Sequence, residues 1–313
     1  MFNREFFREE KMKKKRNLLI LLPLLLILII LISCSSQQNK QYHANKKLGP
    51  QINYTVTGID ASSGEMTKAK KMLDVYDLKE KNWQLMPSST AAMASTLGKA
   101  IDDKKPIVVT AFQPHWMFAK YKLKFLKDPK NVFGETQHFS TVARTGLKKD
   151  NPGAYQLLQN FHWTIDDSYS TMLKINNGMN ADKAAKQYIR DNPKKVASIL
   201  QGVPQGHGEK SKLFYTPYDY ESAVTHVVKG LLNKKGYKAT TQQLDVSIMW
   251  QALSSGQVDV TLVAQLPVSH GAYAKKYQGK VDEVRVNLKN AKIGLAVPTY
   301  MKDINSINDL KNK

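Results

Sequence analysis

One turn near the start of the chain has the residue types to bind an anion. Gly58, Ile59 and Asp60 follow a predicted strand and precede a predicted helix. Backbone N–H groups at such a turn lie at the positive end of the helix, which favours a bound negative charge. Strand-to-helix turns also contain glycine for purely structural reasons, so this motif alone does not establish a site.

The other chemistry-bearing residues form no catalytic signature. The seven histidines are scattered, and none has the paired helical spacing of a zinc site. The chain has neither a Walker-type phosphate loop nor a Gly-x-Ser-x-Gly nucleophile elbow. Cys34 is the only cysteine, which excludes an intramolecular disulfide and a multi-cysteine metal site. We therefore predict a protein that is not an enzyme, has no catalytic residues and needs no metal or other cofactor.

The first part of the chain has the organisation of a secretory signal. A basic cluster at residues 13–16 precedes an apolar run at residues 18–32. This run has fifteen residues, whereas a membrane-spanning helix needs about 20, so its length suits the core of a signal peptide. Leu31-Ile32-Ser33-Cys34 resembles the bacterial lipobox, in which the cysteine thiol receives a lipid.

We expect residues 1–33 to be removed as a signal peptide. Residues 34–50 would then be a lipidated Cys34 followed by a polar, flexible tether. This places the protein on the extracellular face of the cell membrane. An uncleaved signal anchor that ends in a chance cysteine is the alternative. Translation from Met1 and from Met12 both stay open, and Met12 would place the lysine cluster directly after the initiator.

The net charge of +21 is spread along the chain. Outside the signal, lysines occur singly or in pairs, often beside acids, as in Asp102-Asp103-Lys104-Lys105. Solvated pairs of this kind are typical of an ordinary soluble surface and not of a nucleic-acid-binding patch. We predict no nucleic-acid partner.

From residue 52 onward, short apolar runs alternate with amphipathic helical patterns, which predicts an α/β fold. Three helices are predicted within residues 150–200, and Ser88 or Ser89 is expected to cap the helix that follows it. A linker with glycine and proline at residues 201–211 favours two small lobes over one large sheet. The candidate strands are residues 52–57, 84–86, 107–112, 139–143, 213–216, 239–244, 258–265 and 292–297.

Several motifs, which occur in one order along the chain, support a family resemblance. They are Gly58-Ile59-Asp60, Ser88-Ser89-Thr90-Ala91-Ala92-Met93, Lys105-Pro106-Ile107-Val108-Val109-Thr110, Pro114-His115-Trp116-Met117-Phe118-Ala119-Lys120-Tyr121, Asn160-Phe161-His162-Trp163-Thr164, Met249-Trp250-Gln251, Leu266-Pro267-Val268-Ser269-His270 and Asn305-Ser306-Ile307-Asn308-Asp309-Leu310. From about residue 52 to the C-terminus, the chain resembles the glycine betaine-binding lipoproteins of Gram-positive osmoprotectant ABC importers, in the quaternary-amine uptake family.

The resemblance implies a two-lobe periplasmic-binding-protein fold of the second type, which closes on a ligand in the interlobe cleft. Lobe one would comprise residues 50–135 plus 290–313, and lobe two residues 136–289. It also implies ABC permease and ATPase subunits as partners, although the sequence does not identify them. We expect the protein itself to be a monomer.

For the anionic end of the ligand, the resemblance implies binding by backbone N–H groups at Gly58 and Ile59 and by the side chain of His270. This chain retains all three residues.

For the trimethylammonium end, the resemblance implies a cage of three tryptophans that hold the cation against their π faces. This chain has Phe112, Tyr218 and Gln265 at those positions, and its four tryptophans lie elsewhere, where we expect them in the core. Phenylalanine and tyrosine offer weaker π faces, and glutamine offers a hydrogen-bonding amide instead. We therefore expect weaker binding of glycine betaine than in a three-tryptophan relative, unless Tyr215 or Tyr220 supplies a wall.

These observations predict an extracellular lipoprotein that binds a small zwitterionic osmolyte, such as glycine betaine, and delivers it to an ABC importer. One alternative keeps the transport role but changes the ligand to another small polar molecule, because the cage is replaced. A second alternative is a surface lipoprotein that binds the envelope through its charge, and a tight complex with one small molecule would count against it. An extracellular enzyme is disfavoured by the missing catalytic signatures.

The lipidation prediction can be tested with Cys34→Ala. The variant should keep its folded domain and should be either released from the membrane or left unprocessed, because the thiol that receives the lipid is gone. Membrane fractionation with a labelled fatty acid measures this. Unchanged labelling of the variant would rule out Cys34 as the anchor.

Overall fold

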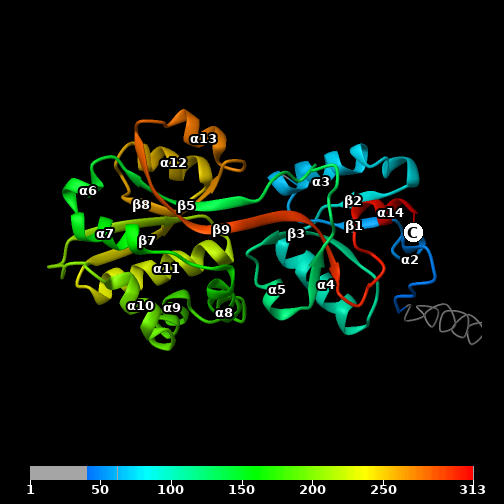
Figure 1. Ribbon diagram of the computed structural model, residues 1–313, viewed down its shortest axis with the longest axis horizontal. Coiled ribbons are helices and arrows are strands. Elements are labelled where there is room, and N and C mark those ends of the chain that lie inside the picture. Colours follow the sequence, from blue (N-terminus) through cyan, green and yellow to red (C-terminus); the bar gives the residue numbers. More distant parts are fainter. Residues whose placement is uncertain (1–40, 62, 313) are drawn as a thin grey trace, which may run out of the picture. The chain divides into compact units, whose positions relative to one another are not determined.

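The computed structural model describes residues 41–61 and 63–312 (Figure 1). The predicted signal peptide, residues 1–33, and the predicted lipidation site, Cys34, lie outside the described residues. From His43 onward the chain belongs to one compact unit, to which all that follows refers. In the part of the chain that the structure describes, no helix is both long enough and apolar enough to cross a membrane.

The described strands are joined by hydrogen bonds into one nine-stranded series (Figure 1). Their order is β2-β1-β3-β9-β5-β8-β6-β7, and β4 pairs with β9 off this path. The strands are β1 (Thr55–Thr57), β2 (Gln84–Met86), β3 (Val108–Gln113), β4 (Leu123–Phe125), β5 (Gln137–Arg144), β6 (Lys210–Tyr215), β7 (Lys238–Gln243), β8 (Val260–Leu266) and β9 (Val281–Pro298).

Strand β9 changes its partner along its length. As far as Ala291, which is paired with Gln137, it runs antiparallel to β5. From Lys292, which is paired with Gln113, it runs antiparallel to β3 and then to β4. One strand therefore links the group β5, β6, β7 and β8 to the group β1, β2, β3 and β4. The predicted lobe boundary at residue 290 lies beside this change of partner, and the division into two lobes stays a prediction.

The helices lie between the strands in sequence. Over the described residues they are α2 (Leu48–Gln51), α3 (Gly64–Val75), the 3-10 helix η1 (Lys79–Lys81), α4 (Thr90–Asp102), α5 (Met117–Lys120), α6 (Leu147–Asp150), α7 (Pro152–Asn160), α8 (Ile165–Asn176), α9 (Ala181–Asp191), α10 (Pro193–Leu200), α11 (Asp219–Lys234), α12 (Val246–Ser254), α13 (Gly271–Lys276) and α14 (Ile307–Asn312).

Local sequence determines where several helices begin. Ser89 caps α4, as its side chain accepts a hydrogen bond from the backbone N–H of Ala92 at 3.1 Å. Thr164 starts α8 with a complete capping box. Pro152 and Pro193 occupy the first turns of α7 and α10, where a missing N–H removes no intrahelical bond.

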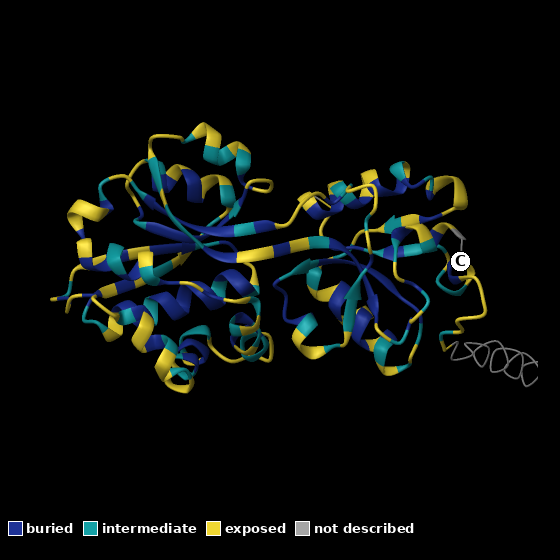
Figure 2. Ribbon diagram, viewed as in Figure 1, coloured by how far each residue is buried: buried dark blue, intermediate teal, exposed yellow. Residues whose placement is uncertain are grey.

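The core lies along the sheet. Figure 2 shows the strands largely buried, whereas many of the surrounding helices expose one face. The four tryptophans, at positions 83, 116, 163 and 250, are each at most 8% exposed, which confirms the prediction that they pack in the core. Burial of such large apolar side chains is the main source of folding free energy.

The structure confirms the predicted α/β class, and each of the eight predicted strands overlaps an observed one. The prediction of three helices within residues 150–200 is wrong, because this segment holds four: α7, α8, α9 and α10. Gly178 has a left-handed φ of +91°, and Asn180 caps the next helix, so the chain breaks between α8 and α9.

Two strand segments were not predicted. These are β4 and the first part of β9. In the early part of β9, valines are interspersed with charged residues such as Asp282, Glu283 and Arg285. Acidic residues are uncommon in strands. Pairing with the buried strand β5 makes this segment a strand despite its composition.

We expect Ser89→Ala to lower the free energy of unfolding by about 0.5–2 kcal/mol, because it removes the cap of α4. Denaturant unfolding measures this. Ser95→Ala is the matched control, since Ser95 is exposed within the same helix and alanine is the better helix former. Equal losses in the two variants would contradict the assignment of the cap.

Candidate functional site

A cavity of about 580 Å³ lies where β9 changes partner. Its lining includes Ala291 and Lys292 of β9 together with their pairing partners, Gln137 of β5 and Gln113 of β3. The first turns of α3 and α11 and the end of β8 complete it. Cavities that hold small molecules typically have roughly 300–1,000 Å³. The size therefore suits a small ligand.

Five of the six residues predicted to bind the ligand line this cavity. Ile59 follows β1, Phe112 lies near the end of β3, Tyr218 precedes α11, Gln265 lies in β8, and His270 precedes α13. The fold thus brings together residues from widely separated segments. Their contact with a ligand stays a prediction.

Gly58 is the predicted residue that does not line the cavity. Its backbone N–H donates to the carbonyl of Met86 at 2.8 Å, so this group is already paired. A Cβ added at Gly58 would lie 2.4 Å from the sulfur of Met66, which is closer than packing allows. The glycine therefore makes room for the side chain of Met66 beneath the turn.

Two aromatic rings meet at the cavity. The centroids of Phe112 and Tyr218 are 6.4 Å apart at an interplanar angle of 74°, an edge-to-face arrangement. Phe112 also packs edge-to-face against His115 at 4.7 Å, which restricts its ring. Tyr218 is 41% exposed. Aromatic faces are the groups that bind cations by cation–π contact, so the prediction of a cation near Phe112 and Tyr218 stays open.

Two tyrosines were considered as replacements for the missing tryptophans of the cage. Tyr220 lines the cavity and Tyr215 does not. Tyr220 packs against Phe139 with ring centroids 4.6 Å apart, and its hydroxyl is buried without a hydrogen-bond partner among the described residues. Tyr215 instead packs edge-to-face against His226 at 5.5 Å.

His270 is held as a neutral hydrogen-bond donor. Its Nδ1 accepts the backbone N–H of Gln265 at 3.2 Å, so the ring proton is on Nε2. Burial lowers the pKa of His270 to about 4. At neutral pH its Nε2–H can therefore donate to an anionic ligand group while the ring stays uncharged.

A buried carboxylate stands beside the predicted cage position. Glu221 accepts hydrogen bonds from the backbone N–H of Thr216 at 2.8 Å and from the Thr216 hydroxyl. It also accepts one from Nε2 of Gln265 at 3.3 Å. Burial raises the pKa of Glu221 to about 7, and these donors only partly offset the rise. Gln265 therefore supplies no π wall but supports a carboxylate.

A second buried carboxylate, Glu65, lines the cavity from the first turn of α3. Burial raises its pKa to about 8, and the neighbouring Thr110 hydroxyl offsets this only in part. Its Oε1 has no hydrogen-bond partner among the described residues. No sequence pattern marks Glu65 as a cavity residue, because an acid in the first turn of a helix is ordinary.

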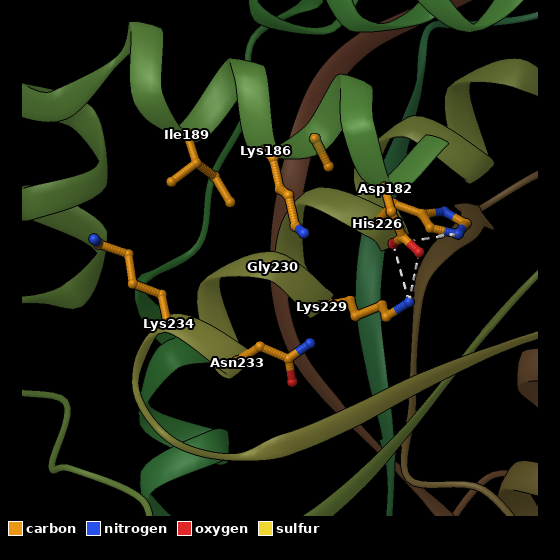
Figure 3. Close-up of a pocket in the computed structure, with 9 residues that line it drawn as sticks. Asp182, Lys186, Ile189, His226, Lys229, Gly230, Asn233 and Lys234 are labelled. Atoms are coloured by element: carbon orange, nitrogen blue, oxygen red, sulfur yellow. Dashed lines mark hydrogen bonds and ion pairs between the residues drawn. The ribbon is translucent and has the colours of Figure 1, made fainter. Parts of the chain in front are cut away.

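A separate hollow of about 410 Å³ lies between α9 and α11 (Figure 3). The carboxylate of Asp182 binds Nζ of Lys229 at 2.9 and 3.0 Å, and one of its oxygens lies 4.0 Å from Nε2 of His226. The central polar groups of this hollow thus satisfy one another. Through these contacts they link α9 to α11. Oε1 of Glu65, in contrast, has no such partner among the described residues.

No group of three or more acidic, histidine or cysteine side chains within residues 41–61 and 63–312 is arranged to hold a metal ion.

Comparison with known sequences places the chain in a family. The sequence profile of OpuAC, the substrate binding domain of ABC-type glycine betaine transport systems, matches residues 37–191 and 212–313. The chain is 50% identical over 270 residues to the glycine betaine/carnitine transport binding protein GbuC of Listeria monocytogenes serotype 1/2a (strain 10403S). This alignment covers 86% of the chain and 90% of GbuC.

Solved structures give partial matches. Lactococcal OpuAC in its closed-liganded conformation complexed with glycine betaine is 40% identical, with 53% of this chain and 64% of that chain covered and a TM-score of 0.41. An ABC-transporter choline-binding protein in complex with choline is 26% identical, with coverages of 50% and 55% and a TM-score of 0.40. In both matches the chain spans less than two thirds of the solved protein.

The two buried carboxyl groups predict how stability depends on pH. Their folded-state pKa values, about 8 for Glu65 and about 7 for Glu221, exceed the ordinary value of 4.5. The stability that they contribute is complete below the ordinary pKa and is lost as pH rises through the raised values. His115 and His270 have pKa values lowered to about 4, so their effect on stability has the opposite sign. It is confined to pH values below about 6.5.

We therefore expect the free energy of unfolding of the ligand-free protein to fall from about pH 6.5 to about pH 8.5, by at most about 1.4 kcal/mol per pH unit for each carboxyl group. Glu65→Gln should flatten this dependence, because the amide does not titrate. Denaturant unfolding across this range measures the effect. A stability that stays constant with pH in the unmodified protein would contradict it.

Proposed function

The chain belongs to the OpuAC family, the substrate-binding domains of ABC-type glycine betaine transport systems, and we propose that it binds a small zwitterionic osmolyte of the glycine betaine type and delivers it to an ABC importer. The main support is the convergence of Ile59, Phe112, Tyr218, Gln265 and His270 on one cavity. The relative from Listeria is named for glycine betaine and carnitine, which agrees with a ligand of this class.

The anionic end of the ligand is assigned to His270 and the turn at Ile59. The neutral imidazole donates through Nε2–H, as its Nδ1 is occupied by the N–H of Gln265. Ser63 and Gly64 at the start of α3 also line the cavity, so the positive end of this helix faces the same space. Gly58 contributes through the shape of the turn, since its N–H is paired with Met86.

The cationic end is assigned to two aromatic rings and two buried acids of the lining. Phe112 and Tyr218 supply π faces, and the buried carboxyl groups of Glu65 and Glu221 supply negative charge when a bound cation favours their ionised form. Two aromatic faces and two carboxylates thus replace the three-tryptophan cage that the family resemblance implies.

The proposal also covers the partners of the protein and its place at the membrane. The protein acts as a binding protein without catalysis, as a monomer, and passes its ligand to ABC permease and ATPase subunits. It is held on the extracellular face of the membrane by a lipid on Cys34. The family is one of transport binding proteins, which supports this assignment.

The carboxylate assignment is tested with His270→Asn. Asparagine can keep an acceptor for the Gln265 N–H, but it lacks a donor at the position of Nε2. We expect glycine betaine to bind about 10- to 150-fold more weakly, the range of a charge-assisted hydrogen bond. The affinity for choline, which has no carboxylate, should fall much less. Titration calorimetry measures both.

His207→Ala is the control, because His207 is exposed and does not line the cavity. It should change neither affinity. Equal losses for glycine betaine and choline in His270→Asn would refute the assignment of His270 to the carboxylate.

A further inference from the structure

Two hydrogen-bonding atoms on the cavity lining are buried and have no partner. Oε1 of Glu65 and the hydroxyl of Tyr220 both lack one among the described residues. The two side chains are only 7% and 2% exposed. Nearly all buried polar atoms in proteins are hydrogen-bonded, so such a pair on one cavity points to a ligand that supplies the bonds.

Glu65 is one of the groups that the proposed function assigns to the cation. The pKa of the Tyr218 hydroxyl is raised by burial and then by the negative charges of Glu221, Asp60 and Glu65. A single phenol therefore lies within electrostatic reach of both cavity carboxylates. Tyr218 is also the ring that packs edge-to-face against Phe112.

In the part of the chain that the structure describes, neither Glu65 nor Glu221 forms an ion pair with a cationic side chain. The lysines on the lining are engaged elsewhere: Nζ of Lys68 donates to the carbonyl of Phe133 at 2.6 Å, and Nζ of Lys292 lies 4.9 Å from the ring centroid of Phe125.

We propose that the cavity prefers a zwitterion whose cationic nitrogen carries at least one N–H, such as a partly methylated or unmethylated amine, over a fully methylated ammonium. This inference rests on the proposed function and specifies its substrate class. A quaternary ammonium has no N–H, so it would lie against the carboxyl group of Glu65 on the cavity wall without donating a hydrogen bond to it. A nitrogen with an N–H donates to this carboxyl group while the methyl groups or chain contact Phe112 and Tyr218.

The proposed preference predicts that a proton is released when the ligand binds. Because the pKa of Glu65 is about 8 in the ligand-free protein, its carboxyl group is mostly protonated near neutral pH. A cation bound against this group favours the ionised form, so binding releases a proton to the buffer. The other charged or titratable groups on the lining include Glu221, Lys68, Lys292, His270 and Tyr218.

The test is titration calorimetry of the full-length protein in detergent with a methylation series: glycine betaine, N,N-dimethylglycine, sarcosine and glycine. All of them keep the carboxylate and differ in the number of N–H groups. We expect N,N-dimethylglycine to bind at least about tenfold more tightly than glycine betaine, the lower range of a charge-assisted hydrogen bond. Repeating the titration in buffers of different ionisation enthalpy should show proton release.

Glu65→Leu should remove both the preference and the proton release, and Glu65→Gln should retain part of the preference through its amide oxygen. Glu80→Leu is the matched control, since Glu80 is exposed on η1, and it should behave as the unmodified protein. If a Glu65 variant does not fold, the ligand series on the unmodified protein still decides.

The outcomes separate this inference from the proposed function. Glycine betaine binding as tightly as N,N-dimethylglycine, with no effect of Glu65→Leu on the ratio, would overturn the N–H preference and leave the proposed function intact. Binding of none of these zwitterions would overturn both.

Discussion

The pairing of β9 is the constraint on which the site depends. Its hydrogen bonds run to β5 up to Ala291 and to β3 from Lys292 onward, so one strand fixes the relative position of both groups of strands. Phe112 is paired with Ile293 and lies next to this change of partner, and the cavity opens at the same place. Because backbone pairing sets register, a slip of one residue would turn Phe112 away from the cavity.

Burial has opposite effects on two groups that line the cavity. It lowers the pKa of His270, which keeps this residue a neutral donor, and it raises the pKa of Glu65, whose Oε1 has no hydrogen-bond partner among the described residues. A zwitterion can match both, since its carboxylate accepts and its cation neutralises. The hollow between α9 and α11 lacks this property, because Asp182 is already paired with Lys229.

The replacement of tryptophans changes how a cation would be held. A π cage binds any cation of suitable size through the ring quadrupole, without requiring an N–H. Here Gln265 donates to Glu221 and thereby supports a buried carboxylate where the resemblance implies a third ring. A carboxylate is stabilised most by a hydrogen-bond donor, so the same fold would favour a ligand nitrogen with fewer methyl groups.

The amino-acid sequence by itself determined the α/β class, the positions of the main strands, a helix cap at Ser88 or Ser89 and, through the family resemblance, most of the residues predicted for the site that line the cavity. These depend on local pattern: apolar periodicity, capping chemistry and motifs. Only the tertiary structure decided that β9 extends over charged residues and that Glu65 is buried, with no partner for its Oε1 among the described residues. Burial and pKa depend on groups distant in sequence, such as Thr110 beside Glu65, and no local pattern contains them.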